Sequence, residues 1–413
     1  MSLKKKDTAI SLASVIIGQA IFFVCLSLIG REWGPEELGK LNFNLSLSMF
    51  IGTIMAFRYE LACIQDKEEK SYQALVQVIT ITASSFVFLY AMASIWDLTD
   101  STTILIFSTT FILQQASSLY LNTLRKYVLI GLIKISANAS FVVSLIILIN
   151  SNTLSSTFEI YTKINLAITI LSLTLILANT QHPKQIFNIS FLKENLRFPQ
   201  YTLPATILSS ALTYSLPIAM PFLFGPITAG YFAATQRFGF FPVSLIAQSI
   251  SGVFRREVIS AINSNNGNLL KTYKSHAKLL LAISACYLLF GNLFFGMLIK
   301  VLLGDNWNQA IIFFHIISPV YALQIIYIPL SQIFISTNNQ KTDLLIQTLT
   351  FISTVGALLA SYYFLLSPLL TLIIFSVSGV ATLLIGLSLT HTTIKAITTE
   401  KSMIFPPLKK YSS

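Results

Sequence analysis

Arginine is the side chain in this sequence with the most to offer for binding chemistry. Arg31, Arg58, Arg237 and Arg255 stand inside long apolar runs or at their ends. A guanidinium presents a planar fork of donors that matches the oxygens of carboxylates and phosphates. If the apolar runs cross a membrane, a charge within them costs about 2.5–3.5 kcal/mol on insertion scales. Such arginines are therefore candidates for holding an anion.

Each basic residue also has a purely structural interpretation. If the helix that carries Arg237 starts near Phe232, Arg237 lies one to two turns inside it; if the helix starts at Phe238, Arg237 only anchors the helix end. Arg58 either binds an anion or is a positive anchor that pairs loosely with Glu60. Anchoring at the membrane surface also stays open for other basic residues, namely Arg31, Arg255, Arg256 and Lys134.

Residues of catalytic type form no constellation. The four histidines are scattered, and none stands near cysteines or carboxylates at metal-ligand spacing. No apolar run holds paired carboxylates, and the three cysteines do not imply a disulfide framework. We therefore expect a protein that is not an enzyme and that has no metal site and no cofactor. A membrane enzyme that uses isolated charges is the alternative.

Composition places the chain in a membrane. Of its 413 residues, 54% are hydrophobic and only 10% are charged, whereas about a quarter are charged in soluble proteins. Apolar runs of about 17–25 residues predict membrane-spanning helices. About twelve such runs occur, at 11–29, 41–57, 72–95, 103–121, 128–149, 160–177, 201–224, 232–254, 279–299, 310–335, 344–366 and 369–389. The predicted fold class is an all-α polytopic membrane protein.

The basic residues predict the topology. A net charge of +11 could indicate a nucleic-acid partner, but the Lys and Arg residues stand in short loops between the apolar runs. This is the positive-inside pattern of membrane proteins, so we expect no nucleic acid and both termini on the cytoplasmic side. That orientation places all but five of the 27 Lys and Arg residues inside, the exceptions being Arg31, Lys40, Lys163, Arg237 and Lys300.

A short unit occurs twice, about 191 residues apart. Gly34-Pro35 and Gly225-Pro226 each open a turn that a second glycine ends, an apolar span follows, and a basic exit closes the unit at 57–60 and at 254–257. Repetition at half-chain period indicates two related bundles. The predicted domains are an N-terminal six-helix lobe (1–180), a cytoplasmic linker (181–200), a C-terminal six-helix lobe (201–390) and a cytoplasmic tail (391–413).

Prolines and glycines predict bends in the seventh and eighth spans. Pro204, Pro217 and Pro221 lie in the seventh span, and Gly239 and Pro242 follow Arg237 in the eighth. Several prolines in one membrane helix favour a kinked, moving element that lines a cavity, although a bent structural helix is the alternative.

These motifs together resemble a known family. The stretch 196–204, then Pro217, Gly225, Arg237 and Pro242, is similar to the second half of Wzx-type polysaccharide flippases. They belong to the multidrug/oligosaccharidyl-lipid/polysaccharide exporter superfamily. The stretch 57–62 resembles the signature that closes their second helix, and the turn at 34–39 also fits. After Ala62 the sequence departs from the family pattern.

The resemblance implies two six-helix lobes around a cationic central cavity. Alternating access would move an undecaprenyl-diphosphate-linked oligosaccharide, an O-antigen or capsule repeat unit, to the outer leaflet of the bacterial inner membrane. Arg58 and Arg237, with Arg31 and Arg255 as further candidates, would hold the diphosphate. The O-unit polymerase and chain-length machinery would be partners besides the bilayer. Polar side chains available for sugar hydroxyls, or for contacts between helices, are Gln19, Asn44, Gln115, Asn138, Asn165, Tyr214 and Gln248.

Two rival functions differ in the residues that they require. A multidrug exporter of amphipathic cations, from the same superfamily, would need carboxylates in its cavity, where this sequence offers arginine and almost no acid. An O-unit polymerase would show large external loops, and the predicted loops are short.

Overall fold

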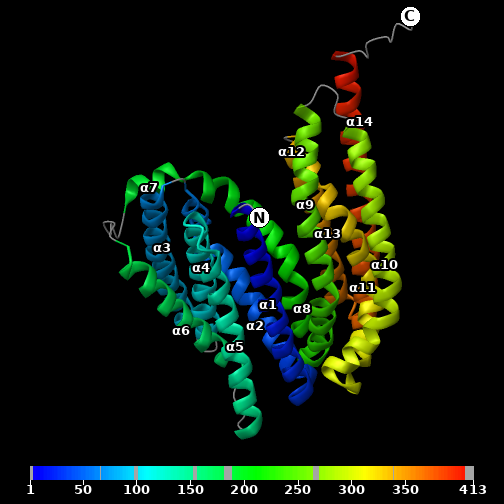
Figure 1. Cartoon of the computed structure of the whole chain (residues 1–413). Coiled ribbons are helices and arrows are strands. Elements are labelled where there is room, and N and C mark those ends of the chain that lie inside the picture. The colour runs from blue at the N-terminus through cyan, green and yellow to red at the C-terminus, as the bar shows by residue number, and fades with distance from the viewer. Residues whose placement is uncertain are drawn as a thin grey trace, which may run out of the picture. The chain divides into compact units, whose positions relative to one another are not determined.

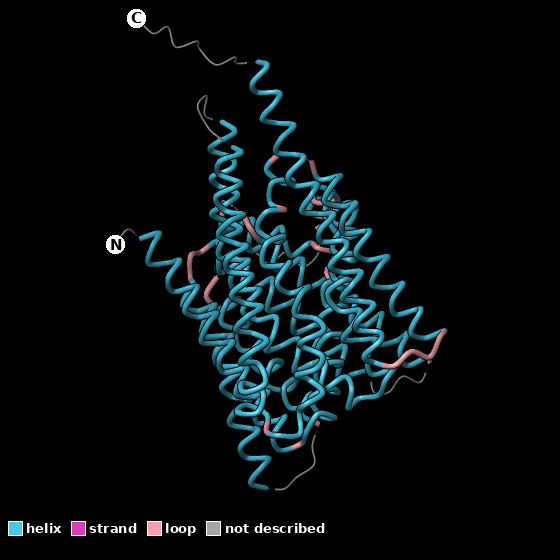
Figure 2. Tube along the Cα trace, turned by 90° about the vertical axis from the view of Figure 1, so that its right-hand side faces the viewer, coloured by secondary structure: helices cyan, strands magenta, loops and turns pink. Residues whose placement is uncertain are grey.

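Helices make up every regular element that the structure describes. This computed structural model describes residues 3–65, 67–96, 101–151, 156–180, 188–263, 269–337 and 339–404. Figure 2 shows the described helices joined by short loops, with no strand among them. The predicted all-helical polytopic fold is confirmed.

The chain divides into two compact units, unit 1 (Met1–Gly230) and unit 2 (Tyr231–Ser413). Their helices are labelled in Figure 1. Unit 1 contains α1 (Leu3–Glu32), α2 (Gly34–Met55), η1 (Tyr59–Cys63), α3 (Glu68–Ile95), α4 (Ser101–Thr123), α5 (Tyr127–Ser151), α6 (Thr157–Ala178), α7 (Ile189–Glu194), η2 (Phe198–Thr202) and most of α8 (Leu203–Ala234). Unit 2 continues with η3 (Thr235–Gly239), α9 (Phe240–Asn263), α10 (Leu269–Leu303), η4 (Asp305–Trp307), α11 (Asn308–Leu330), α12 (Gln332–Ser336), α13 (Gln340–Tyr363) and α14 (Pro368–Ile404).

The predicted lobe boundaries at 180 and 200 remain predictions. The first part of the predicted linker, residues 181–187, lies outside the described residues, as does the tail beyond Ile404. The later part of the linker contains the short helix α7 and the π-helical turn η2.

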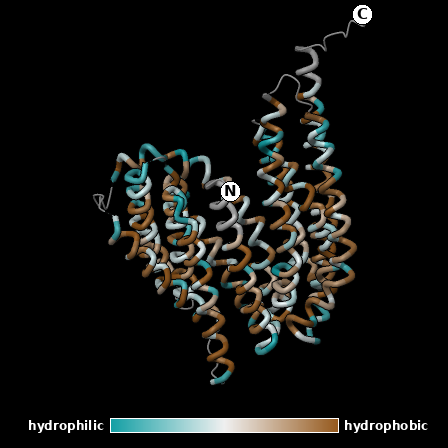
Figure 3. The backbone as a smooth tube through the Cα atoms, in the orientation of Figure 1, coloured by the Kyte–Doolittle hydropathy of each residue, from teal (hydrophilic) through white to brown (hydrophobic). Residues whose placement is uncertain are grey.

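Ten helical segments in the described ranges are long and apolar enough to cross a membrane. One of them, Phe198–Ile262, is 65 residues long and contains two of the predicted spans, 201–224 and 232–254. The predicted span at 41–57 corresponds to α2, which is helical but stands outside the ten and carries charged residues in its first two turns. Figure 3 shows hydrophobic residues along the long helices and hydrophilic ones near several helix ends. Each of the twelve predicted apolar runs therefore contains a helix.

The first glycine of the repeated Gly-Pro turn has a positive φ in both copies. Gly34 has a φ of 74° and Gly225 a φ of 81°, in the left-handed region that glycine adopts without a Cβ clash. Pro35 and Pro226 then stand where a helix begins, a position at which the missing N–H of proline is not needed. At Gly225 the backbone leaves helical geometry, with a ψ of 166°, so α8 consists of two helical parts.

The two turns also pack against each other within unit 1. A Cβ atom built on Gly39 would lie 2.1 Å from the carbonyl oxygen of Pro226, and one on Gly230 would lie 1.7 Å from the carbonyl oxygen of Pro35. Each copy thus places its second glycine against the proline of the other copy. Small residues let membrane helices approach this closely. The repeat is therefore a structural feature, in which α2 crosses the last part of α8.

The exits of the two copies differ. In the first copy α2 ends at Met55, and Phe57 and Arg58 have positive φ values of 50° and 65°. In the second copy the predicted exit at 254–257 lies inside α9, which continues to Asn263. The two exits therefore differ in backbone conformation, and the basic exit of the second copy is part of a continuous helix.

Packing within each unit relies on small and aromatic residues. In unit 1, α1 packs on α5, and α2 packs on α4, where a Cβ on Gly52 would lie 2.8 Å from the Ser108 carbonyl oxygen. In unit 2, α11 packs against α9, α10 and α14. The ring of Phe314 on α11 stacks 3.8 Å from that of Phe295, and a Cβ on Gly239 would lie 2.9 Å from the Phe314 ring.

Candidate functional site

Unit 1 contains a polar pocket between four of its helices. The pocket has a volume of about 140 Å³, enough for about five water molecules at ~30 Å³ each. Its lining comes from α1 (Ser14, Val15, Gly18, Gln19), α4 (Gln114), α5 (Lys134, Ala137, Asn138) and α6 (Tyr161, Asn165). All four helices are candidate membrane spans. A hollow with so many amide and hydroxyl groups in an apolar bundle is a candidate ligand site.

Hydrogen bonds between the helices hold the amides of the polar pocket in place. Asn138 donates its amide N–H to the carbonyl oxygen of Gly18 at 2.9 Å, and the Tyr161 hydroxyl donates to the Asn138 amide oxygen at 3.0 Å. Asn165 donates to the Tyr161 carbonyl oxygen at 2.8 Å and accepts from Gln114 at 3.2 Å. The network links α1, α4, α5 and α6, so these side chains are oriented before a ligand arrives.

Lys134 is the only ionisable side chain in the polar pocket apart from the Tyr161 phenol. Its side chain has no ion pair or hydrogen bond among the residues that the structure describes, and the same is true of the Gln19 side chain. Three residues before Lys134, a Cβ on Gly131 would lie 2.2 Å from the Ser14 hydroxyl, so α1 and α5 are closely packed beside the pocket.

No described carboxylate of unit 1 lies in the middle of a span. Those whose side chains the structure describes stand in the first or last turn of a helix or between helices, namely Glu32, Glu36, Glu37, Glu60, Glu68, Glu69, Glu159 and Glu194. Glu159 pairs with Lys163 at 2.7 Å on the exposed face of α6. The described residues contain no cluster of His, Cys, Asp and Glu that could hold a metal ion.

Arg58 lies in a buried ion pair at the end of α2. Its Nη1 is 2.7 Å from Oε1 of Glu60, and the two side chains are 16% and 1% exposed. Burial raises the pKa of Glu60, and the charge of Arg58 opposes that rise. The segment is fixed by the Cys63 carbonyl oxygen, which accepts hydrogen bonds from the hydroxyls of Ser71 and Thr123. A phosphate would have to compete with the Glu60 carboxylate for the guanidinium.

Arg237 lies in the π-helical turn η3 and is half-buried. The residues before it, from Tyr231 to Ala234, are already helical, so the alternative helix start at Phe238 is wrong. The Tyr287 hydroxyl donates to the carbonyl oxygen of Gly239 at 2.8 Å and anchors the same turn. Arg237 is therefore part of the helical stretch and not an anchor at its start.

The other predicted site residues are divided between the units. In unit 1, Arg31 is exposed in the last turn of α1, Tyr214 is half-buried on α8, and Pro204, Pro217 and Pro221 lie along α8. In unit 2, Gln248, Arg255 and Pro242 are exposed on α9. Of the predicted sugar-binding side chains, the structure brings Gln19, Asn138 and Asn165 together in the polar pocket.

Sequence reasoning did not place Lys134, Gln114 or Tyr161 in a site. One signal was available, because Lys134 and Asn138 are four residues apart, and so are Tyr161 and Asn165. Residues four apart share a helix face, so each pair marks a polar face in an apolar span.

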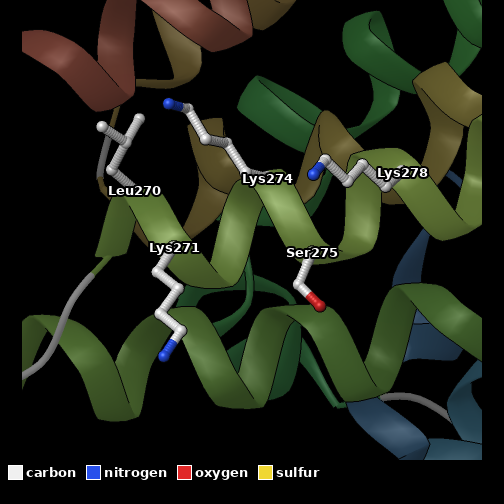
Figure 4. Close-up of a pocket in the computed structure, with 5 residues that line it drawn as sticks. All are labelled: Leu270, Lys271, Lys274, Ser275 and Lys278. Atoms are coloured by element: carbon white, nitrogen blue, oxygen red, sulfur yellow. The ribbon is translucent and has the colours of Figure 1, made fainter.

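Unit 2 has a second hollow, on the surface of the first turns of α10 (Figure 4). Its volume is about 440 Å³, and it is lined by Leu270, Lys271, Lys274, Ser275 and Lys278. Figure 4 shows the ammonium of Lys271 turned away from those of Lys274 and Lys278. The 35 residues of α10 correspond to about 52 Å at 1.5 Å per residue, longer than the ~30 Å hydrocarbon core. The lysines therefore suit the membrane surface, as the positive-inside pattern predicts.

Solved transporter structures have the same fold. No protein-family model and no curated protein sequence matches the chain. An inward-facing MATE family multidrug resistance transporter of the MOP superfamily aligns with a TM-score of 0.67 at 14% identity, over 94% of this chain and 99% of that chain. The lipid II flippase MurJ in an inward closed conformation aligns with a TM-score of 0.67 at 14% identity, over 95% of this chain and 90% of that chain. The MATE multidrug transporter DinF-BH gives 0.64 at 16% identity, over 95% and 96%.

These similarities define the class of protein by fold. The chain is a polytopic membrane protein with the fold of MATE transporters and of MurJ. At 14–16% identity the similarity concerns architecture alone. The MATE neighbours are described as multidrug transporters and MurJ as a lipid II flippase, so the neighbours differ in what they transport. The choice between those cargoes depends on the residues of this chain.

Proposed function

We propose that this protein is a flippase of the Wzx type, which moves a lipid-linked oligosaccharide from the cytoplasmic to the outer leaflet of a bacterial inner membrane. The alternative is a multidrug exporter of amphipathic cations. Both functions use the fold, since MurJ is described as a lipid II flippase and the MATE neighbours as multidrug transporters.

The charge of the polar pocket is the observation that favours the flippase. Its lining offers one lysine, the amides of two asparagines and two glutamines, the hydroxyls of a serine and a tyrosine, and no carboxylate. A cation in a low-dielectric pocket needs an anionic partner, because desolvation of an unpaired charge is costly. Sugar hydroxyls, by contrast, are well matched by amides and phenols. The pocket therefore suits a glycan better than a cationic drug.

The arginines supply the second part of the proposal. A diphosphate requires several cationic donors, and Arg58 and Arg237, with Arg31 and Arg255, are the candidates. For Arg58 the cargo phosphate would replace the contact with Glu60, 2.7 Å away. Tyr214 and Gln248 are candidates for sugar contacts outside the polar pocket, and the bends at Pro204, Pro217, Pro221, Gly239 and Pro242 are candidates for the elements that move.

The membrane potential favours this direction of transport. Moving a negative charge outward across an inside-negative membrane releases about 2.3 kcal/mol per charge per 100 mV. A diphosphate cargo would use that energy directly. The chain itself is proposed to carry out no covalent chemistry, with both termini cytoplasmic and the O-unit polymerase and chain-length machinery as later partners of the cargo.

The deciding experiment locates the cargo after the gene is deleted from its bacterium. Complete, unpolymerised lipid-linked units on the cytoplasmic leaflet, without surface polysaccharide, are expected for a flippase. Units on the outer leaflet would indicate a polymerase. Normal surface polysaccharide with new sensitivity to cationic drugs would favour the exporter.

Complementation with variants then tests the arginines. Arg58→Ala and Arg237→Ala should insert in the membrane and fail to restore surface polysaccharide. Lys163→Gln is the matched control, because Lys163 pairs with Glu159 on an exposed helix face. If cells complemented with either arginine variant make wild-type amounts of surface polysaccharide, other residues hold the diphosphate.

A further inference from the structure

We infer that the polar pocket binds the carboxylate of an acidic sugar, such as a uronic acid, with Lys134 as the group that selects it. This inference rests on the proposed transport of a lipid-linked oligosaccharide and adds the class of glycan that the protein prefers.

The argument begins with the missing counter-charge. Lys134 is the eighth residue of α5, about 10 Å from its first residue at 1.5 Å per residue. Its side chain is exposed, so a ligand can reach the ammonium, and a lysine inside a membrane-spanning helix is stabilised by water or by an anion. The pocket contains no carboxylate, and Lys134 has no ion pair among the described residues. A negative charge carried by the ligand would complete the site.

The surrounding side chains are suited to one sugar. The amides of Asn138, Asn165 and Gln114 are already fixed by contacts between helices, and the amide of Gln19 has no partner in the described chain. An amide offers both donors and an acceptor, which is what a ring of hydroxyls requires. The Asn138 amide and the Lys134 stem lie on neighbouring turns of the same helix face. Lys134 can therefore bind the carboxylate of a sugar while the neighbouring Asn138 amide binds its hydroxyls.

The number of cations decides between a sugar carboxylate and the diphosphate of the lipid carrier. A diphosphate carries two or more negative charges and is bound by several charged donors. The polar pocket offers a single ammonium, which matches the single charge of one carboxylate. The volume of about 140 Å³ also corresponds to about one sugar ring. The diphosphate would instead be bound by the arginines outside the polar pocket.

Binding to the purified, full-length protein in nanodiscs tests the inference. The probes are two soluble trisaccharides that differ at one position, which is glucuronic acid in one and glucose in the other. The wild-type protein should bind the acidic probe at least tenfold more tightly, equivalent to about 1.4 kcal/mol. Lys134→Gln should bind both probes equally, and Lys134→Arg should keep most of the preference.

Lys163→Gln is the control in this assay as well, and it should bind as the wild type does. Equal binding of the two probes by the wild type would overturn the inference, and so would a preference that survives in Lys134→Gln. The second outcome would mean that Lys134 only extends toward the membrane surface.

Transport in proteoliposomes separates this inference from the proposed function. The cargoes are the same two glycans on an undecaprenyl diphosphate carrier. Faster movement of the acidic cargo, lost in Lys134→Gln, would support both. Equal movement of the two cargoes would contradict the inference alone, whereas movement of neither would contradict the proposed function.

Discussion

Replacing Gly230 by alanine should force α2 away from the last part of α8. The new Cβ would lie 1.7 Å from the carbonyl oxygen of Pro35 and 2.5 Å from its carbonyl carbon, whereas ordinary contacts begin at 3.4 Å. The clashing atoms belong to the backbone, so no side-chain rotation can relieve them. Overpacking of this kind costs about 1–3 kcal/mol, and the helix preference of alanine over glycine returns at most ~1 kcal/mol. We expect a net destabilisation of up to about 2 kcal/mol, and of about 1–3 kcal/mol relative to a glycine-to-alanine change at an open helical position.

The midpoint of thermal unfolding in detergent measures this effect. Gly39→Ala should lower it as well, since its Cβ would lie 2.1 Å from the Pro226 carbonyl oxygen. The unfolding midpoint of the double variant should fall by less than the sum of the two single decreases, because the same separation of the helices removes both clashes. Gly356→Ala on α13 is the control, since nothing lies within 4 Å of its Cβ. If both variants at the crossing unfold at or above the midpoint of that control, the close approach of the two turns is wrong.

Three further predictions concern ionisable and polar groups. Burial holds the pKa of Glu60 above its ordinary value of 4.5, so the folded state binds a proton more tightly than the unfolded state does. The free energy of unfolding should therefore fall as the pH rises above 4.5 through the pKa of the folded state. Glu60→Gln should flatten this pH dependence in unfolding measured at several pH values. Tyr161→Phe removes the donor to the α5 amide and should cost about 0.6–1.7 kcal/mol, whereas Tyr90→Phe, at an exposed ring, should leave the unfolding midpoint unchanged. Lys274→Gln combined with Lys278→Gln should reduce the extra thermal stability that phosphatidylglycerol confers over phosphatidylcholine, by about 1 kcal/mol per lysine; an unchanged lipid effect would show that the α10 hollow does not contact headgroups.

The sequence alone determined the helices and the repeated turn. A membrane requires each spanning segment to satisfy its own backbone hydrogen bonds, so long apolar runs predict helices directly. The Gly-Pro turns were equally readable, because a glycine before a proline suits a positive φ followed by a helix start, as at Gly34 and Gly225. These are local properties that a linear pattern carries.

Tertiary structure decided which polar residues meet. Gln19, Asn138 and Asn165 were predicted only as separate polar side chains, and their convergence with Lys134 depends on how α1, α4, α5 and α6 rotate about their axes and pack. Hydropathy fixes where a helix crosses the membrane but says little about the direction that one face points.

Tertiary structure also decided the state of the arginines. Arg58 was expected either to bind an anion or to be an anchor paired loosely with Glu60, and the reversal of the chain after α2 places the two side chains in a close, largely buried ion pair. Arg237 was given two possible positions, and the helical backbone on both sides of it selects the one inside the helical stretch. The role of Gly39 and Gly230 depended on two segments, 191 residues apart in sequence, approaching within contact distance. Contacts between such distant segments form only when the chain folds, and for that reason the sequence determined the elements of this protein while the packing determined its site.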